Sequence, residues 1–244
     1  QPEPALFPVG LKGLSRLVAQ WADDKLFWAA MAYNFSPRGM AQMFGGSPDA
    51  PPEKWGTVAK VFADDRGKMR VGMPRMPLGD ATSAYKGYLR RIAHMVDEQP
   101  FLMGSAPCVA DYAVYHPLWF TRTQTTVLAG ILDATPSVLA WMDRMAAIGH
   151  GSSTPMTAAD AITVCAASKG SQSLLHGSTF QDDHGIPLGS RVTITAESFG
   201  PEPTDGELVA ATRTHYTLRR SDERAGTVHV HFPRIGFILK KAEA

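Results

Sequence analysis

Apolar positions in the first two thirds of the chain recur at intervals of three and four residues, which is the period of amphipathic α-helices. Patterns of this kind predict helices over residues 11–35, 51–66, 80–98 and 108–124. A further helix is predicted from Thr135-Pro136, a capping residue followed by a first-turn proline. Another short helix is predicted to follow Thr157, where Asp160 stands at the position that completes a capping box.

After about residue 175 the period changes to two, which is typical of half-buried strands. Apolar residues alternate with polar ones at Val192/Ile194, Tyr216/Leu218, Val228/Val230/Phe232 and Ile235/Phe237/Leu239. Gly- and Pro-containing turns separate these stretches. We therefore expect an α+β multidomain chain. An all-α helical bundle over residues 1–170 is followed by a small antiparallel β domain over 175–244, folded as a barrel or a rolled sheet.

The most informative motif lies at residues 100–112, with the sequence Pro-Phe-Leu-Met-Gly-Ser-Ala-Pro-Cys-Val-Ala-Asp-Tyr. An apolar Pro-Phe-Leu segment can pack a loop, Gly104 allows a turn, and a helix is predicted to start at Cys108. Asp111 then occupies the third helical position. Its carboxylate can reach back to the unpaired N–H groups of the helix start, where the helix dipole favours negative charge.

This motif resembles the capping box and hydrophobic staple that begin the buried helix of the C-terminal domain in the glutathione S-transferase family. Residues 1–10, which include Pro4-Ala5-Leu6-Phe7-Pro8, look like that family's interdomain linker. The family usually has Ser or Thr where Cys108 stands. Since a thiol is a weaker acceptor than a hydroxyl, we expect Asp111 to carry most of the capping. The β region lies outside the usual two-domain pattern and looks like an accessory domain.

The resemblance implies a second domain, of thioredoxin-like fold, that holds glutathione as co-substrate. Residues 1–110 show no period-two strand followed by a crossover helix, so we expect that domain to be absent from this chain. The opening at Gln1, without a methionine, suggests a linker cut from a longer protein. We therefore assign no catalytic residue, and we expect the chain alone to be inactive in glutathione conjugation.

The resemblance also implies that the helical domain lines the site of the electrophile, the hydrophobic compound to which glutathione is joined. The matching candidates are Trp28, Met31, Tyr33, Phe35, Tyr112, His116, Trp119 and Phe120. Aromatic residues at helical spacing more often belong to a core, so each candidate has a structural alternative. Pro117 removes a hydrogen bond within the 108–124 helix, which bends the helix and could shape this site.

Other signals are weaker. His229 and His231 share a strand face, and His215 lies on another strand. A pair of histidines two residues apart lacks the third and fourth ligands that a metal site requires, so we expect no metal. Residues 213–244 carry seven Lys or Arg against three acids, with aromatics between them. That excess is modest, so nucleic-acid binding by the β domain is the less favoured alternative, after a non-catalytic protein that binds a hydrophobic ligand. Arg234 could instead tie the β domain to the helical one.

Composition adds limits rather than a function. The net charge is +1 and charged residues make up 19% of the chain, so no strong field draws it to nucleic acid or to an anionic membrane. No apolar run of about eighteen residues is present, so we expect no membrane span. The two cysteines fit neither a disulfide framework nor a zinc spacing, which favours the cytoplasm. The family resemblance further implies a homodimer formed through the first two long helices.

Overall fold

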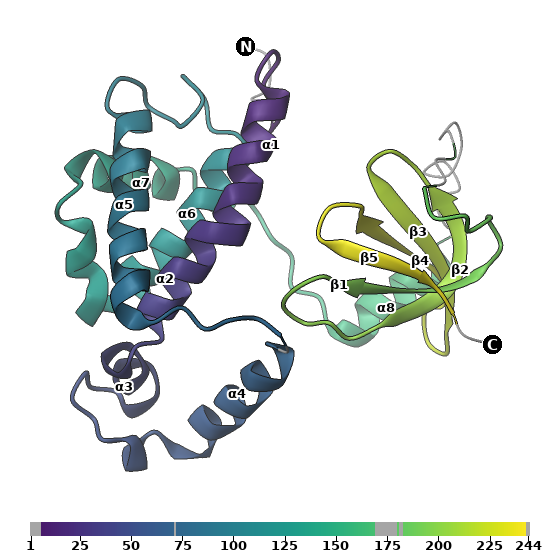
Figure 1. Cartoon of the computed structure of the whole chain (residues 1–244), viewed down its shortest axis with the longest axis horizontal. Helices are drawn as coiled ribbons and strands as arrows, with labels where there is room; N and C mark the ends of the chain where they lie inside the picture. The colour runs from purple at the N-terminus through teal and green to yellow at the C-terminus, as the bar shows by residue number, and fades with distance from the viewer. Residues whose placement is uncertain (1–5, 71, 169–179, 181–182, 243–244) are drawn as a thin grey trace. The chain divides into compact units, whose positions relative to one another are not determined.

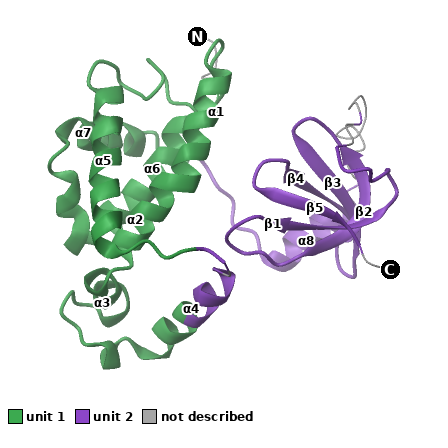
Figure 2. Ribbon diagram, viewed as in Figure 1, with its two compact units in different colours: residues 1–63, 74–151 green, residues 64–73, 152–244 purple. Residues whose placement is uncertain are grey.

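The computed structural model describes residues 6–70, 72–168, 180 and 183–242, and Figure 1 labels its helices and strands. The chain divides into two compact units, which Figure 2 colours separately: residues 1–63 with 74–151, and residues 64–73 with 152–244. The first unit is helical, and the second contains the β-sheet. The sequence pattern placed residues up to 170 in the helical bundle, whereas this division groups the last helix, α8 (Ala158–Ala167), with the sheet.

The helical elements before residue 151 are α1 (Lys12–Trp21), η1 (Ala22–Leu26), α2 (Phe27–Asn34), α3 (Pro37–Gly45), η2 (Pro52–Lys54), α4 (Gly56–Met69), α5 (Leu78–Val96), α6 (Val109–Thr123), η3 (Thr126–Leu132) and α7 (Pro136–Ala147). Of these, η1 is a π-helical turn, and η2 and η3 are 3₁₀-helices. The helix predicted over 51–66 is observed as a short 3₁₀ turn followed by α4. Residues of α4 up to 63 belong to the first unit and those from 64 to the second.

The long helix predicted over residues 11–35 is present, but the π-helical turn η1 interrupts its α-helical geometry. Ala22 and Leu26, the first and last residues of this turn, are fully buried, while Asp23, Asp24 and Lys25 between them are exposed. Isolated π-helical turns inside α-helices are rare and frequently occur at functional sites. The turn therefore makes this part of the helix a candidate position for a functional site.

Helix α3 was not predicted, although its ends carry clear signals. Pro37 stands in its first turn, and Gly46 ends it with a φ of 72°, in the left-handed region that glycine favours. Inside the helix, a Cβ atom on Gly39 would lie 1.8 Å from the carbonyl oxygen of Asn34. Only glycine permits this close approach, so Gly39 fixes how α3 packs against the end of α2.

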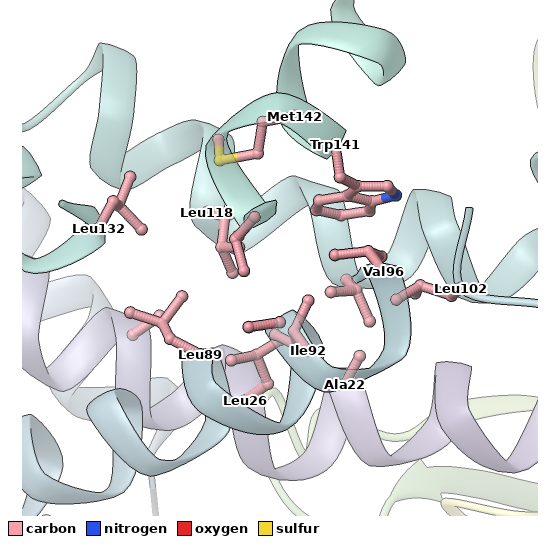
Figure 3. Close-up of a cluster of buried hydrophobic side chains, with 14 of the residues drawn as sticks. Ala22, Leu26, Leu89, Ile92, Val96, Leu102, Leu118, Leu132, Trp141 and Met142 are labelled. Atoms are coloured by element: carbon pink, nitrogen blue, oxygen red, sulfur yellow. The ribbon is translucent and has the colours of Figure 1, made fainter. Parts of the chain in front are cut away.

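The core of the first unit forms between helices α2, α5, α6 and α7. Figure 3 shows its centre, where Leu89 and Ile92 of α5 lie with Leu118 of α6 and Trp141 and Met142 of α7. All five side chains are 1% exposed or less. Burial of an aliphatic side chain contributes about 1.5–3 kcal/mol, so this cluster stabilises the packing of α5, α6 and α7.

A buried polar network crosses the same core. Thr121 Oγ1 of α6 accepts a hydrogen bond from Asn34 Nδ2 of α2 at 2.9 Å and lies 2.9 Å from the hydroxyl of Tyr85 on α5. The Thr125 hydroxyl donates to Asn34 Oδ1 at 2.8 Å, and the Thr121 hydroxyl lies 3.1 Å from the carbonyl oxygen of Pro117. Asn34, Tyr85, Thr121 and Thr125 are all fully buried. Since a buried polar group without a partner is costly, these bonds fix how α2, α5 and α6 align.

The sheet consists of β1 (Arg191–Ala196), β2 (Thr204–Ala211), β3 (His215–Asp222), β4 (Gly226–Pro233) and β5 (Phe237–Lys241). All pairings are antiparallel, in the order β4-β3-β2-β1-β5. One face carries the core of the unit: Ile186, Val192, Ile194, Leu208, Ala211, Tyr216, Leu218 and Leu239, with Phe232 and Phe237 packed against it. The alternating pattern therefore predicted the core face correctly.

The sequence left a barrel and a rolled sheet as alternatives, and the structure excludes the closed barrel because the sheet is open. Strands β4 and β5 lie at its two edges, and no ladder joins them within the described residues. The core face explains this result, since no residue of β4 is fully buried and β5 buries only Leu239. None of the described helices is long and apolar enough to cross a membrane.

Candidate functional site

The start of α6 is fixed by the Asp111 carboxylate, which is fully buried and accepts three hydrogen bonds. Oδ2 accepts the backbone N–H of Cys108 at 2.9 Å. Oδ1 accepts the backbone N–H of Leu102 at 2.9 Å and the indole N–H of Trp141 at 3.0 Å. Asp111 therefore joins the loop before α6, the start of α6 and α7 at a single buried point.

Cys108 completes a reciprocal capping box with Asp111 at the same helix start. The loop before it turns at Gly104, which has a φ of 126° and pairs with Phe101 as an isolated bridge. Burial, more than any other cause, raises the pKa of the Cys108 thiol above its ordinary value. The thiol therefore stays protonated at neutral pH, so it is suited to packing and not to nucleophilic chemistry.

Helix α6 has two faces of opposite character. Its buried stripe consists of Ala110, Asp111, Val114, Pro117, Leu118 and Thr121. Its outer side carries Tyr112 (45% exposed), His116 and Trp119 (37% exposed), spaced four and three residues apart. A surface-facing helix side usually carries charged or small polar groups. Here it presents three aromatic rings, and exposed apolar rings of this kind are typical of a binding surface.

Helices η1 and α2 both contact α6, and the first residue of α2, Phe27, reaches its outer side. The Phe27 ring stacks on the His116 imidazole, with centroids 6.0 Å apart and planes inclined by 24°. The Trp28 ring meets Phe27 edge to face, at 5.1 Å between centroids. We call the surface formed by Tyr112, His116 and Trp119 the α6 aromatic face. Of the other candidate residues from the sequence, Trp28 lies beside this face, next to Phe27.

The other candidates lie elsewhere in the first unit. Phe35 and Phe120 pack together, with ring centroids 5.9 Å apart. Phe35 also stacks on Phe62 of α4, at 5.4 Å, and Phe62 in turn contacts Phe44 of α3. These four phenylalanines, all half-buried, form a second aromatic cluster that holds the first half of α4 to the helical unit.

Met31 and Tyr33 face the core. Met31 is 7% exposed and belongs to the buried cluster. Tyr33 is half-buried, meets Tyr85 edge to face at 5.8 Å, and donates its hydroxyl hydrogen to the carbonyl oxygen of Leu128 at 3.3 Å. Burial raises the pKa of the Tyr33 hydroxyl above its usual value. Met31 and Tyr33 therefore pack in or against the core of the first unit.

The sequence candidates omitted Phe27, whose ring stacks on His116 and so belongs to the α6 aromatic face. Asp23 lies in η1, and its pKa is raised above the usual value. The causes are partial burial first and then the charge of neighbouring Asp24, while His116 acts in the opposite direction. The signal for Phe27 is its place beside Trp28.

In the second unit, four arginines are paired with carboxylates. Arg219 contacts Glu207 at 2.6 Å, and Arg191 and Arg220 contact Asp205 at 3.0 and 3.4 Å. Arg234 contacts Asp183 at 2.7 Å and lies over the Tyr216 ring, 4.7 Å from its centroid. These partners of Arg234 all belong to the β unit. The pairings reduce the positive charge that this sheet offers to a nucleic acid.

Three histidines lie on the polar side of β3 and β4. The His215 and His231 rings are 5.8 Å apart, and His231 Nδ1 is 2.8 Å from the Thr217 hydroxyl. Burial and then the charges of His215 and His229 lower the pKa of His231. Within the described residues, no three His, Cys, Asp or Glu side chains come together in a way that could hold a metal ion.

Comparison with known proteins supplies a family. The chain is similar to a solved GST-like protein from Pseudomonas syringae, with 32% sequence identity and a TM-score of 0.76, over 99% of this chain and 72% of that one. It also matches the β-etherase LigF from Sphingobium sp. strain SYK-6, at 18% identity over 57% and 60% of the two chains, but the TM-score of 0.36 is too low to bear on function. No protein-family model matches the chain, and no curated protein does. The match to the first protein spans both units of this chain, including the β-sheet. The chain therefore belongs to the glutathione S-transferase (GST)-like family.

Proposed function

We propose that the α6 aromatic face holds a hydrophobic electrophile for conjugation with glutathione. The observation that carries this proposal is the row of Tyr112, His116 and Trp119 on the outer side of a helix whose opposite side is anchored in the core. The rings offer apolar area to a flat ligand, and the buried stripe with its Asp111 anchor keeps them in fixed positions. Family membership supports glutathione as the second reactant.

We assign glutathione itself to a thioredoxin-like domain outside this chain. Apart from the Phe101–Gly104 bridge, the described residues before 168 form no strand, so they offer no sheet of the kind that such a domain requires. On this proposal the chain supplies one half of a composite active site. Mixed alone with glutathione and 1-chloro-2,4-dinitrobenzene, it is expected to give no turnover above the rate in buffer.

The aromatic face is tested by ligand binding, which does not require glutathione. We expect 1-anilinonaphthalene-8-sulfonate to bind the chain with increased fluorescence, and Trp119→Ala to weaken that binding about tenfold because a stacking surface is lost. Ile148→Ala is the matched control: Ile148 lies in the same unit and is exposed to a similar degree (45%, against 37% for Trp119), but it stands at the end of α7 and not on this face.

The outcomes separate the proposed roles. Equal loss of binding in Trp119→Ala and Ile148→Ala would mean that the dye reports general exposure, which removes the support for this face. Dye binding that depends on Trp119, together with no conjugation even when the thioredoxin-like domain is supplied, would favour a non-catalytic protein that binds a hydrophobic ligand.

A further inference from the structure

The two ends of the α6 aromatic face are separate ring positions. Tyr112 and Trp119 are seven residues apart, which returns them to the same side of the helix after two turns. With a rise of about 1.5 Å per residue, their Cα atoms are separated by about 10 Å along the helix axis. Both side chains are open to solvent, at 45% and 37% exposed. A ligand on this face can therefore contact two rings that lie well apart from each other.

The position between these two rings is already in contact with a ring of the protein. His116 lies one helical turn from each, and Phe27 stacks on its imidazole, with centroids 6.0 Å apart and planes inclined by 24°. Trp28 in turn meets Phe27 edge to face, at 5.1 Å. Within the described part of the chain, no ring stacks on Tyr112 or Trp119. The ring surfaces that remain for a ligand are therefore those at the two ends of the face.

Each end residue also keeps a hydrogen-bond donor for a ligand. Among the residues that the structure describes, neither the Tyr112 hydroxyl nor the Trp119 indole N–H has a hydrogen-bond partner. The indole of Trp141, in contrast, donates to the buried Asp111 carboxylate at 3.0 Å. A side chain with an apolar ring and an available donor suits a ligand that is apolar on one part and polar on another. Each end of the face can therefore hold a ring together with a polar group on that ring.

The backbone of α6 keeps the two ring positions at a fixed spacing. Between them, Pro117 and Leu118 are buried in the core. At the start of α6, the Asp111 carboxylate accepts three hydrogen bonds, one of them from α7. Because α6 cannot shift without breaking these contacts, a ligand must match the spacing that the helix imposes. Rings that are fused or bonded directly lie too close together to reach both positions, whereas two rings joined by a short chain can reach them.

We propose that the α6 aromatic face selects ligands in which a short chain of atoms joins two aromatic rings. One ring packs on Tyr112 and the other on Trp119, and the chain that joins them passes over His116. Acceptor groups on the rings receive hydrogen bonds from the Tyr112 hydroxyl and the Trp119 indole N–H. This inference rests on the proposed function, since it names the ligand class of the same face.

The test compares two ketones by equilibrium dialysis in the absence of glutathione. The first, 1,3-diphenylpropan-1-one, has two rings joined by a carbon chain, and the second, propiophenone, has a single ring. Neither ketone reacts with a thiol, so the exposed Cys165 does not interfere. We expect the wild-type chain to bind the two-ring ketone at least about fivefold more tightly, because a second stacked ring adds to the affinity.

Variants at the two ring positions complete the test. Tyr112→Ala and Trp119→Ala should each reduce the preference for the two-ring ketone to within about twofold, because the second ring then has no partner. Trp119→Phe keeps a ring at this position and should preserve the preference. Ile148→Ala is again the matched control outside the face, and it should behave as wild type. Circular dichroism checks that each variant is folded.

The results distinguish this inference from the proposed function. If the wild-type chain binds both ketones equally while the naphthalene dye still depends on Trp119, the two-ring selection is wrong and the aromatic face stands. A preference that persists unchanged in Tyr112→Ala and Trp119→Ala would reflect only the larger apolar area of the ligand, and the inference would again be wrong. If the chain binds neither ketone nor the dye, both proposals are wrong. Loss of the preference in both alanine variants, with its retention in Trp119→Phe, supports the two ring positions.

Discussion

At the scale of single residues, the buried Asp111 carboxylate accepts three hydrogen bonds near the start of α6. Asp111→Asn keeps the shape of the side chain but replaces one acceptor oxygen with an NH₂ donor, which would face a backbone N–H or the Trp141 indole. We expect the free energy of unfolding to fall by about 2–4 kcal/mol, because hydrogen bonds to a charged acceptor are lost and donors are left unpaired. Urea denaturation followed by circular dichroism measures this change.

The matched control for Asp111 is Asp143→Asn on α7. Asp143 is exposed and pairs with Arg122 at 2.7 Å on the surface. Exposed ion pairs contribute little, so a loss below about 1 kcal/mol is expected. Comparable losses in the two variants would contradict the view that Asp111 anchors the start of α6.

The residue scale also shows how far the sequence alone could reach. The capping role of Asp111 follows from its position three residues after Cys108, because that relation is local. The bond from Trp141 could not be predicted, since it joins residues thirty positions apart and depends on how α7 packs. The same limit explains the candidate site. The family resemblance pointed to Tyr112, His116 and Trp119, but it also pointed to Met31 and Tyr33, which face the core, and it missed Phe27.

At the scale of elements, α6 is joined to α2 and α5 by the Thr121 hydroxyl. Thr121→Val conserves the shape but leaves the Asn34 amide and the Tyr85 hydroxyl without this partner in the core. We expect a loss of about 2–4 kcal/mol in the free energy of unfolding, measured by urea denaturation. Tyr85→Phe should cost less, about 1 kcal/mol, because Thr121 keeps its bonds to Asn34 and to the Pro117 carbonyl.

Thr123→Val is the control within the same helix. Its hydroxyl makes the same type of bond four residues back, to the carbonyl oxygen of Trp119 at 2.8 Å, but the side chain is exposed. A change within about 0.5 kcal/mol is expected. If Thr121→Val were equally mild, the buried network would not fix the alignment of the three helices.

In the sheet, partial burial of His231 on β4 gives the protein a sensitivity to acid. The pKa of His231 is lowered in the folded chain, so the unfolded chain binds the proton more readily. Stability should therefore fall as the pH drops through the ordinary histidine pKa of about 6.5. His231→Gln should make the urea midpoint depend less on pH between about 7 and 5. The change in slope should correspond to the uptake of no more than one proton on unfolding.

His150→Gln serves as the comparison, because His150 is exposed in the segment after α7 and belongs to the other unit. It should leave the pH dependence unchanged. A steeper fall of stability toward acid in His231→Gln than in wild type would mean that protonation of His231 stabilises the fold, which is opposite to the effect expected from its lowered pKa.

The regular helices and strands were easier to predict than the open edges of the sheet or the π-helical turn. Long periodic segments such as α5 follow from their own sequences, because one face must meet a core. The π-helical turn and α3 were missed: the first adds one residue per turn without a sequence signature, and the second depends on the close approach at Gly39. The sequence could not decide between a barrel and a rolled sheet, because alternation within strands says nothing about which strands lie at the edges.

At the scale of the whole molecule, the chain presents an exposed apolar side on α1. Leu14 and Leu17 are 51% and 65% exposed, while Ser15 and Ala19 of the same helix face inward. We propose that two copies associate through residues 11–35 and 80–98, with these leucines at the contact. Burying a leucine contributes up to about 1.5–3 kcal/mol, so four of them across a two-fold axis add substantially to the affinity of a dimer.

Light scattering coupled to size-exclusion chromatography should therefore give a dimer for the wild-type chain at tens of micromolar, and a monomer for Leu14→Glu/Leu17→Glu. The control is Val58→Glu/Val61→Glu, because these valines are similarly exposed, at 71% and 61%, but lie on α4. If both double variants eluted as monomers, added charge in general, and not the α1 surface, would control association. A monomeric wild-type chain would leave α1 to contact something other than a second copy, and the proposed dimer would then be wrong.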